Sequence, residues 1–496
     1  MIDIVVDSRV RVLPSPGAAE FRIMPELEAL VVEHTHRNPD YAKARHLGFK
    51  KRVPKFIVTS RDFRSGEEGI SFPRGSERKV REQLGALWMR ARDERTLGDR
   101  TLGRIPEHHP PSGALWPHQR MLVDRAAAAE TALVRSATAS GKTCAALALA
   151  ARLDLPTLVV VHNSNLFKQW IDRCVSELRV PRDWVGQIQG SKRRLGPITV
   201  GMQQTLCGCA AEVAPAFGLV IVDEVHRSAA RTFLEVVDAM TAKYRVGVSD
   251  DERRSDGKEF LIYDMFGPVV GEASHDDLVE HGYVMDVRVR VVPTGFRADW
   301  YVGLEDREKV LAYDQLLAAM ASDATRNRIA VRDVPRDALS GHQVIVFTHR
   351  VEHAYALDRE LNGRGTRSGF VVGEQPAESD RTLDRFRRGE VSVVVGTYQA
   401  LGTGVDMPRA TRGVLATPIA NNQKGHQQFK QYRGRFARAA DGKAEPEVTY
   451  LWDAHVFGAR PLRHLCRWAR DVRVEWNGRY VPGKEVLKEF EGRALE

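Results

Sequence analysis

The sequence predicts an α/β protein with two successive lobes, each built on a parallel sheet, behind a small α+β region. Two observations lead to this prediction. Apolar runs of strand length alternate with helical stretches from residue 115 to about 289, and again from 343 to 417, which is typical of parallel β-α-β units. In the first of these regions, a loop of small residues at 136–143 joins a strand to a helix.

The first lobe is expected to begin its sheet at 131–134, directly before this loop, and to continue with an Ala- and Leu-rich helix at 143–152. Its later strands are predicted at 157–162, 198–201, 218–222 and 244–248. The second lobe is predicted to hold strands at 343–348, 369–372, 391–396 and 413–417, after a mostly helical segment at 296–341. We therefore expect lobes at 114–290 and 291–445, followed by a C-terminal extension at 446–496.

The first 105 residues predict a small accessory domain. Strand-like runs lie at 2–6 and 55–59, and a helical run lies at 77–91. Prolines and a glycine within 106–113 predict a linker, because they cannot continue either neighbour. We expect His108 and His109 in this linker to be exposed to solvent rather than to act as ligands.

The charge balance allows a polyanionic partner. Lys and Arg number 74 against 65 Asp and Glu, a net charge of +9, which speaks to partners and not to fold. Basic residues gather between Lys43 and Lys55, with Tyr41 and Phe49 among them. Cations interleaved with aromatic rings suit phosphate contact and base stacking, although a charge run is as often only a solvated face.

Composition excludes several classes of protein. A hydrophobic content of 43% with 28% charged residues indicates a soluble globular chain rather than a disordered or membrane one. The five cysteines have no ligand-like spacing, so buried free thiols are expected. The first residues lack a basic segment followed by an apolar core, and no apolar run is long enough to span a bilayer. We expect a cytoplasmic protein without a membrane partner.

The loop at 136–143, Ser-Ala-Thr-Ala-Ser-Gly-Lys-Thr, has the character of a phosphate-binding loop. At a helix start, main-chain N–H groups and the helix dipole face the phosphates, a lysine reaches the terminal ones and a hydroxyl holds Mg²⁺. These roles fall to Lys142 and Thr143, and the alternative is a chance Gly-Lys-Thr in a surface turn. The residues expected around the nucleotide here are Ala139, Ser140, Gly141, Lys142 and Thr143.

Two further groups suit phosphoryl transfer. Asp223 and Glu224 end an apolar strand, and such a pair can hold Mg²⁺ and take the proton of the attacking water, respectively. Arg435 and Arg438 lie three apart, on one face if helical. Guanidinium groups can stabilise charge on a transferring phosphoryl group, and the alternative is an ordinary basic helix face.

Taken together, these features resemble the superfamily 2 helicases, nearest to the branch of XPB repair helicases, phage UvsW-like helicases and type III restriction motors. The resemblance covers residues 115–440, with the motifs in the correct order. It implies two tandem RecA-like lobes, ATP and Mg²⁺ as cofactors, and a nucleic acid as partner. More loosely, 38–56 resembles the accessory N-terminal domain of the phage-type members, which implies duplex binding.

In the first lobe, the resemblance assigns roles residue by residue. Leu-Trp-Pro-His-Gln at 115–119 is similar to the adenine-reading segment, which implies that Gln119 lies at the base. The segments 159–170 and 199–206 resemble motifs Ia and Ib and imply contacts with the backbone of one strand. The residues implied at nucleic acid are Asn163, Gln204 and Thr205. Asp223-Glu-Val-His226 resembles the DExH box.

In the second lobe, 344–349 resembles motif IV and implies that Thr348 contacts nucleic acid. The segment 395–408 resembles motif V, which implies Thr397 at nucleic acid and Gly404 and Asp406 near the nucleotide. The segment 431–438 is similar to motif VI. It implies that Gln431 lies near the nucleotide and that Arg435 and Arg438 are finger arginines.

Two departures from the family pattern stand out. Ala139 and Ser136 occupy positions where the branch usually has Gly and Ala, and Ser136 is also where the general motif opens with a Gly that tolerates angles Ser does not. We expect weaker nucleotide affinity from this. Ser-Asp-Asp-Glu at 249–252 stands where motif III has Thr-Ala-Thr-Pro. In the family this segment contacts the DExH histidine, here His226, so that His226 and Ser249 would couple hydrolysis to movement. Its carboxylates could repel phosphates or hold an extra cation.

The sequence therefore predicts an Mg²⁺-requiring, ATP-driven DNA helicase or duplex translocase. Two alternatives remain open at this point: an ATP-gated nucleic-acid clamp that does not unwind, and an RNA helicase. No convincing nuclease constellation is present in the sequence.

Overall fold

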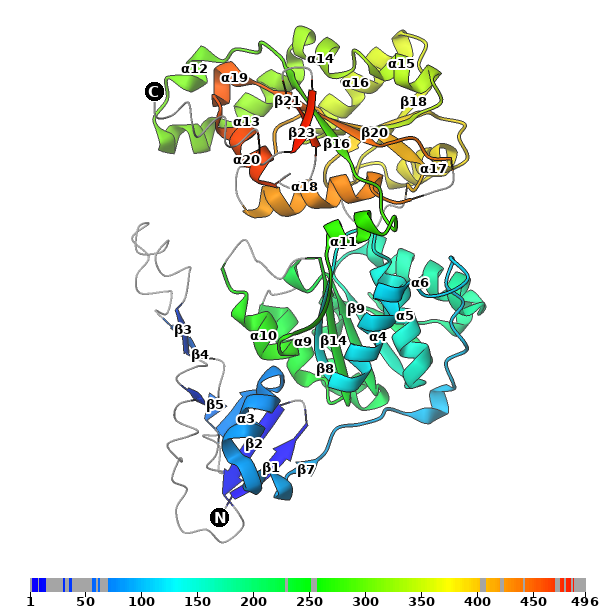
Figure 1. The fold of residues 1–496 in the computed structure, drawn as a ribbon, viewed down its shortest axis with the longest axis vertical. Helices are drawn as coiled ribbons and strands as arrows, with labels where there is room; N and C mark the ends of the chain where they lie inside the picture. The colour runs from blue at the N-terminus through cyan, green and yellow to red at the C-terminus, as the bar shows by residue number, and fades with distance from the viewer. Residues whose placement is uncertain are drawn as a thin grey trace. The chain divides into compact units, whose positions relative to one another are not determined.

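The structure is a computed structural model. The residues that it describes are 2–7, 9–14, 30–31, 35–37, 56–58, 61–62, 70–227, 231–250, 257–401, 407–419, 423–439, 442–468, 473–476, 479–482 and 485. The chain forms two compact units, Met1–Ser274 and His275–Glu496, and each has a large sheet of its own (Figure 1).

The first unit starts with a small sheet of order β5-β6-β2-β1-β7, antiparallel except for the β1–β7 pair. The elements of this domain are β1 (Ile2–Val6), β2 (Arg9–Pro14), β3 (Thr35–Arg37), β4 (Phe56–Val58), β5 (Arg61–Asp62), β6 (Ile70–Pro73), α3 (Glu77–Leu84) and β7 (Arg92–Asp93). The helix predicted at 77–91 is α-helical only to Leu84. Gly85, at a φ of 50°, ends it, and a 3-10 segment follows.

A buried arginine joins this small domain to the lobe that follows it. Arg74 is 1% exposed and donates to the main-chain carbonyls of Ala242 and Lys243. Arg9 adds a salt bridge to Asp238, with Nη1 and Oδ2 3.0 Å apart. The small domain is therefore held to the lobe by hydrogen bonds to main-chain carbonyls of the lobe and by a salt bridge to a side chain of the lobe.

The lobe that completes the first unit is built on an eight-stranded sheet of order β11-β10-β12-β9-β13-β14-β8-β15, parallel except for β11. Its strands are β8 (Thr131–Ser136), β9 (Thr157–Val161), β10 (Gly186–Gln189), β11 (Lys192–Arg194), β12 (Ile198–Met202), β13 (Leu219–Asp223), β14 (Tyr244–Ser249) and β15 (Val269–Ala273). Its helices are α4 (Pro117–Ala129), α5 (Lys142–Leu153), α6 (Ser164–Leu178), α7 (Gln203–Leu206), α8 (Ala210–Val213), α9 (Arg231–Ala239) and α10 (Phe260–Phe266).

Helices cover both faces of this sheet. Figure 1 shows the sheet with α9 and α10 on one side and α4, α5 and α6 on the other. Every residue of β9, β12 and β13 is buried, as expected of inner strands in a sheet covered on both faces. Because β8, β13 and β14 are parallel neighbours, their carboxyl ends meet at one edge of the sheet. Ligands of such sheets bind at this edge.

The second unit has a sheet of order β18-β19-β17-β20-β21-β16-β22-β23, parallel except for the final pair. Its strands are β16 (Arg288–Pro293), β17 (Gln343–Thr348), β18 (Ser368–Val371), β19 (Val393–Thr397), β20 (Ala410–Leu415), β21 (Glu447–Trp452), β22 (Arg473–Trp476) and β23 (Arg479–Pro482). Its helices are α11 (His275–Glu280), α12 (Asp299–Val302), α13 (Asp306–Ser322), α14 (Ala324–Ala330), α15 (Val334–Leu339), α16 (Val351–Gly363), α17 (Pro376–Arg387), α18 (Gln423–Phe436), α19 (Ala454–Phe457) and α20 (Arg460–Trp468).

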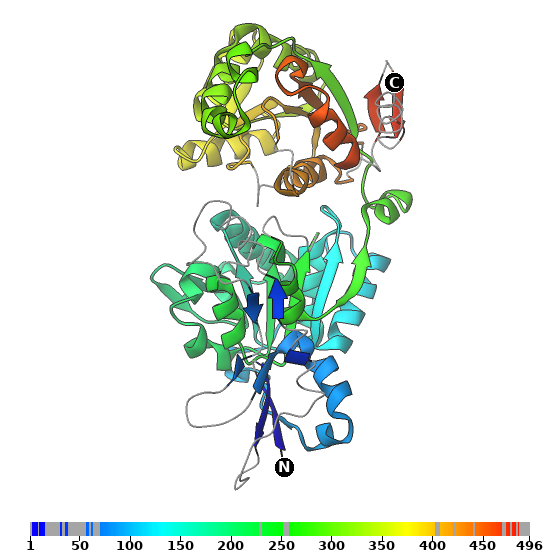
Figure 2. The same ribbon diagram turned by 90° about the vertical axis from the view of Figure 1, so that its left-hand side faces the viewer.

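The predicted fold class is confirmed, because both units are α/β with parallel sheets. Most predicted strands lie within three residues of their observed bounds, and the helical segment expected at 296–341 contains α12 to α15. The last part of the chain is more integrated than a peripheral tail, since β21 pairs with β20 on one side and β16 on the other. The strands β22 and β23 continue the same sheet beyond β16 and are drawn in red in the second view, Figure 2. None of the described helices combines the length and apolar composition that crossing a bilayer requires.

Candidate nucleotide and nucleic-acid site

The loop after β8 has the backbone of a phosphate-binding loop. Gly141 precedes α5 with a φ of 83°, and a Cβ there would lie 2.3 Å from Nε2 of Gln119, so only glycine fits. Ala139 also has a left-handed φ, 72°, at the position where the family usually has glycine. The loop keeps this conformation with alanine, at a cost of about 1 kcal/mol.

Ser136, which stands where the general motif opens with Gly, does not strain the backbone of the loop. Ser136 has an ordinary φ as the last residue of β8, and its Oγ lies 2.6 Å from Oγ of Ser140, both residues being 1% exposed. The strain that comes with a missing glycine is at Ala139 instead. Ser136 therefore tethers the loop through a buried hydroxyl pair.

Lys142, the first residue of α5, lies against the strand that carries the acidic pair. Its Nζ donates to Oε1 of Glu224 over 3.2 Å, and both side chains are less than 15% exposed. Burial alone would lower the pKa of Lys142, but Glu224, Asp250 and Asp223 together raise it above its ordinary value. The lysine is therefore a fixed positive charge among carboxylates.

Asp223 is buried at the end of β13. Burial and the adjacent Glu224 carboxylate raise its pKa to about 6, while Lys142 and a hydrogen bond from Trp170 oppose the shift. That bond runs from Nε1 of Trp170 to Oδ2 of Asp223 over 2.9 Å. The indole thus fixes one oxygen of Asp223.

Glu224 has a φ of 54°, which is rare for a side-chain-bearing residue and often marks a functional position. The turn redirects the chain directly after β13. It brings Oε1 of Glu224 to Lys142 and leaves Oε2 3.3 Å from Nδ1 of His226. The two carboxylates of the pair thus have different neighbours, which suits two different tasks.

His226 lies against the segment that departs from the family pattern. Its Nδ1 is 2.7 Å from Oγ of Ser249 and 3.7 Å from Oδ1 of Asp250. The other oxygen of Asp250 accepts a 3.1 Å hydrogen bond from Oγ1 of Thr138 in the phosphate loop. Asp250 therefore bridges the DExH histidine and the loop that would receive phosphates, whereas Asp251 and Glu252 lie outside the described residues.

The donors at this edge fit Mg²⁺. Thr143 supplies a hydroxyl in the first turn of α5, and Asp223 supplies a carboxylate at the end of β13. Hydroxyl and carboxylate oxygens with water are the ligands that Mg²⁺ prefers. The residue set is therefore the one expected beside a magnesium–nucleotide complex.

Gln119 is 3% exposed, and both the oxygen and the nitrogen of its side-chain amide already form hydrogen bonds. Its Oε1 accepts from N of Trp116 over 3.0 Å, and its Nε2 donates to O of Ser140 over 3.0 Å. The side chain therefore ties the start of α4 to the phosphate loop. A base contact through this amide would require one of these bonds to open.

The nucleic-acid candidates of the first lobe have local structural tasks. Oδ1 of Asn163 accepts from N of Leu166 over 2.8 Å and caps α6. Gln204 is exposed, with Nε2 3.3 Å from O of His162, and Oγ1 of Thr205 accepts from N of Gly190. These residues follow β9 and β12, which are neighbours in the sheet.

In the second unit, Thr348 is fully buried and its Oγ1 lies 2.7 Å from Nδ1 of His353. A contact of this hydroxyl with nucleic acid would require that bond to open. Thr397, 7% exposed, accepts from N of Ala400 over 3.2 Å. Both threonines end neighbouring strands, β17 and β19.

Arg435 and Arg438 would share a face only if one helix held both, and the structure does not meet this condition. The helix α18 ends at Phe436, and Arg438 instead forms an isolated bridge with Val284. The two guanidinium groups are presented by different local structures. Gly404 and Asp406 lie outside the described residues, as does the side chain of Gln431.

Comparison with known proteins gives the family. Residues 113–249 match the family described as "Type III restriction enzyme, res subunit", and residues 328–440 match the "Helicase conserved C-terminal domain". A protein of Acanthamoeba polyphaga mimivirus, named "Putative ATP-dependent RNA helicase L396", is 32% identical over 378 residues, 72% of this chain and 69% of that protein. The chain belongs to the superfamily 2 helicases.

Other similarities of this helicase support the same family and fold. The protein of Kineococcus radiotolerans named "DNA 3'-5' helicase XPB" is 25% identical over 336 residues, 66% of this chain and 57% of that protein. Dbp5 of S. cerevisiae, solved with RNA and ADP BeF3, shares the fold with a TM-score of 0.53 at 14% identity, covering 77% of this chain and 94% of Dbp5. The helicase spans about half the length, 52%, of the first curated relatives it matches.

Two residues of the helicase site carry contacts that the sequence did not reveal. Trp170 lies inside the motif Ia segment, yet its contact with Asp223 joins positions 53 apart. Thr138 lies in the phosphate loop and reaches Asp250 across 112 positions. The signal available for Trp170 was a tryptophan within the motif Ia segment, and nothing in the sequence pointed to a contact of Thr138.

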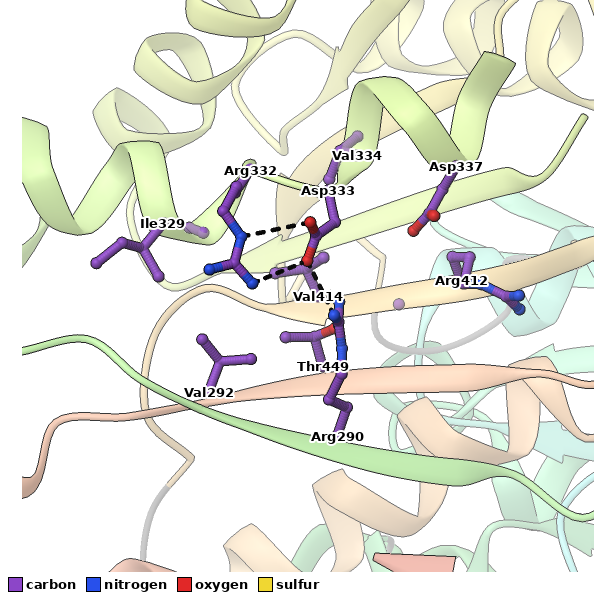
Figure 3. A pocket seen from close by; sticks show the side chains of 12 residues that line it. Arg290, Val292, Ile329, Arg332, Asp333, Val334, Asp337, Arg412, Val414 and Thr449 are labelled. Atoms are coloured by element: carbon purple, nitrogen blue, oxygen red, sulfur yellow. Dashed lines mark hydrogen bonds and ion pairs between the residues drawn. The ribbon is translucent and has the colours of Figure 1, made fainter. Parts of the chain in front are cut away.

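A hollow in the second unit of the helicase is not a ligand site. It is lined by Arg290, Arg332 and Asp333 among others and has a volume of about 10 Å³ (Figure 3), about the space of one water. Asp333 accepts from Arg290 at 2.9 Å and from Arg332 at 3.2 Å. Arg290 also reaches Glu447 of β21 at 3.2 Å. The charges thus neutralise one another and tie β16 to β21.

Proposed function

We propose that this helicase hydrolyses ATP with Mg²⁺ and uses the reaction to move on DNA, either separating strands or translocating along a duplex. The observation that carries the proposal is the convergence of Lys142, Asp223 and Glu224 at one sheet edge, with Lys142 Nζ 3.2 Å from Glu224 Oε1. The relative named as an XPB helicase supports DNA as the polymer.

In this proposal the Lys142–Glu224 pair is the resting arrangement. Lys142 transfers from Glu224 to the β- and γ-phosphates when ATP binds, because a phosphate carries more charge than one carboxylate. Glu224 is then released to accept the proton of the attacking water. Thr143 and Asp223 would hold Mg²⁺, and the ion would supply positive charge that offsets the charge of the phosphates.

The coupling step is assigned to His226 and Ser249, which contact each other at 2.7 Å. A shift of Glu224 on ATP binding changes the surroundings of His226, since Oε2 lies 3.3 Å from its Nδ1. We assign Arg435 and Arg438 as the finger arginines and Gly404, Asp406, Gln431, Gln119, Ala139, Ser140 and Gly141 as further nucleotide contacts. Closure of the two lobes on ATP would bring the arginines to the phosphates.

We assign backbone contact with the polymer to the candidates that follow sheet strands. They are Asn163, Gln204 and Thr205 in lobe 114–290, and Thr348 and Thr397 in lobe 291–445. The accessory domain, 1–105, is proposed to hold duplex, and 106–113 to link it to the first lobe. The remaining residues, 446–496, form the C-terminal extension.

The test is the ATPase rate of the purified chain with single-stranded, duplex, forked and four-way DNA and with RNA. We expect DNA to stimulate hydrolysis, and Lys142→Ala to abolish it. A matched control is Lys192→Ala on the exposed β11 of the same lobe, which should leave the rate unchanged. Absence of DNA stimulation, or full activity in Lys142→Ala, would contradict the proposal.

A second candidate function, an ATP-gated clamp without unwinding, is favoured by Asp250. Its carboxylate sits between Thr138 and His226, in the segment that in the family couples hydrolysis to movement. ATP-dependent DNA affinity without strand separation would support the clamp. So would the gain of unwinding in the triple variant Asp250→Ala/Asp251→Thr/Glu252→Pro.

RNA is the alternative polymer, since contacts to a phosphate backbone discriminate poorly between the two. One relative is named as an RNA helicase and another as a DNA helicase. Stimulation of the ATPase by RNA but not by DNA would decide for RNA.

A further inference from the structure

Behind the phosphate loop, three side chains of different chemistry meet in a buried cluster. His108 comes from the linker, Cys144 from the first turn of α5 and Glu177 from the end of α6. Nε2 of His108 lies 2.8 Å from Oε2 of Glu177 and 3.9 Å from Sγ of Cys144. The side chains of His108 and Glu177 are 6% and 2% exposed, and Cys144 is 7% exposed. The expectation that His108 would be solvent-exposed is therefore wrong.

We propose that His108, Cys144 and Glu177 form a binding site for a zinc-class divalent cation. A thiolate, an imidazole nitrogen and a carboxylate oxygen are the donors that such ions take, and water would supply the fourth corner of the tetrahedron. All three ligand atoms lie within 4.8 Å of one another. The hard cations Mg²⁺ and Ca²⁺ are disfavoured by the sulfur and the nitrogen.

The observed separations are close to those that an ion would impose. Bonds of 2.0–2.3 Å in a tetrahedron place ligand atoms about 3.2–3.7 Å apart. The contact between His108 and Glu177, 2.8 Å, would open slightly, and the contact between His108 and Cys144, 3.9 Å, would close slightly. Binding would displace the thiol proton of Cys144 to solvent.

The surroundings hold the carboxylate in place. Oε1 of Glu177 accepts from Arg173 over 2.9 Å, and the main-chain O of Glu177 accepts from N of His109 over 2.7 Å. Oε2 is thereby directed at His108. The positive charge of Arg173 weakens the affinity for a cation but leaves this second oxygen available as a ligand.

The site would join three elements, the linker, α5 and α6, through one ion. Cys144 follows Lys142 and Thr143, so an ion here would fix the first turn of α5 from behind and hold the linker to it. Metal binding would therefore stabilise the first lobe and keep the phosphate loop in position. This inference does not depend on the proposed motor activity.

The experiment measures metal in the purified full-length chain. After EDTA treatment, incubation with Zn²⁺ and gel filtration, we expect about one equivalent of zinc per chain. Cobalt in place of zinc should give the near-ultraviolet charge-transfer band of a thiolate–cobalt bond. That band identifies the site, because the other possible ligand group in the described residues, Glu224, His226 and Asp250, has no thiol.

Cys144→Ser and His108→Gln should lose both the zinc and the band. The matched controls Cys207→Ala, an exposed thiol, and His109→Gln, the neighbouring histidine, should keep both. The wild-type cobalt spectrum requires no variant to fold. Lack of the thiolate band in wild type, or zinc retained by both Cys144→Ser and His108→Gln, would overturn the proposal.

Discussion

Nε1 of Trp170, on α6, donates a hydrogen bond to Oδ2 of Asp223, at the end of β13, over 2.9 Å. The indole is 2% exposed and the carboxylate residue 6%. Without this donor, the charged form of the buried carboxylate would have one partner fewer and would be less favoured. The bond therefore determines how Asp223 is presented to a metal ion.

Trp170→Phe tests this relationship. The ring is kept and the donor is lost, so the pKa of Asp223 should rise further, because the Trp170 hydrogen bond opposes its elevation. We expect the Mg²⁺ concentration for half-maximal ATPase to rise about tenfold, because the free energy of a hydrogen bond to a charged group corresponds to roughly this factor in a binding constant. Trp184→Phe, on a surface turn of the same lobe, should not change it. An unchanged Mg²⁺ dependence in Trp170→Phe would show that the bond has no role in metal binding.

Asp250→Asn tests the acidic residue beside the phosphate loop. An asparagine oxygen can still accept from Thr138, but the negative charge near incoming phosphates is removed. We expect ATP to bind about threefold to tenfold more tightly, because this factor corresponds to the repulsion between one carboxylate and the phosphates when the surroundings partly screen it. Glu272→Gln, which removes a charge on β15 of the same lobe, is the control. Equal or weaker ATP binding in Asp250→Asn would mean that Asp250 does not oppose the nucleotide.

Ala139→Gly should relax the phosphate loop. The φ of 72° costs an alanine about 1 kcal/mol and a glycine almost nothing. We expect about fivefold tighter ATP binding or an equivalent gain in stability, measured by titration calorimetry and thermal unfolding. Ala137→Gly lies in the same loop without a positive φ, so it should bring no gain. A loss in both measurements for Ala139→Gly would contradict the strain argument.

Thiol reactivity should separate the cysteines at pH 8. Cys207 is exposed, whereas burial raises the pKa of Cys144, Cys174 and Cys466 to about 12. Because the thiolate is the reactive form, a thiol reagent should modify Cys207 rapidly and these three only on unfolding. Mass spectrometry of tryptic peptides identifies the modified residue. Rapid labelling of Cys144 in the metal-free folded chain would contradict its burial.

Acid should destabilise the second unit through His353. Burial, and secondarily Arg326, lower the pKa of His353 to about 3, so the folded state keeps this histidine neutral while the unfolded state protonates below about 6.5. The unfolded state then binds more protons, and stability falls as the pH drops from about 6.5 toward 3. In His353→Gln this loss should be smaller, as measured by the pH dependence of the urea midpoint. An identical slope in the two proteins would exclude the histidine as the cause.

The sequence was sufficient to predict those strands and helices that depend on the local pattern of apolar residues. The apolar runs predicted β9, β12 and β13 because inner strands of a covered sheet are apolar throughout. It was insufficient where distant elements meet. The contacts of Trp170 with Asp223 and of Thr138 with Asp250 depend on how helices and loops pack on the sheet. The helix α18 ends at Phe436, between Arg435 and Arg438, although no Gly or Pro directly follows Phe436 in the sequence to predict this end.

The place of β21 between β20 and β16 has a consequence for biosynthesis. Translation is vectorial, so β16 emerges from the ribosome more than a hundred residues before the strand it pairs with. Until β21 has emerged up to Trp452, β16 has no paired neighbour and β20 is paired only with β17, so both strands present an unpaired edge to other nascent chains. The first lobe completes its own sheet by Ala273 and can close during synthesis, whereas the second must wait and is the stretch on which we expect chaperones to act.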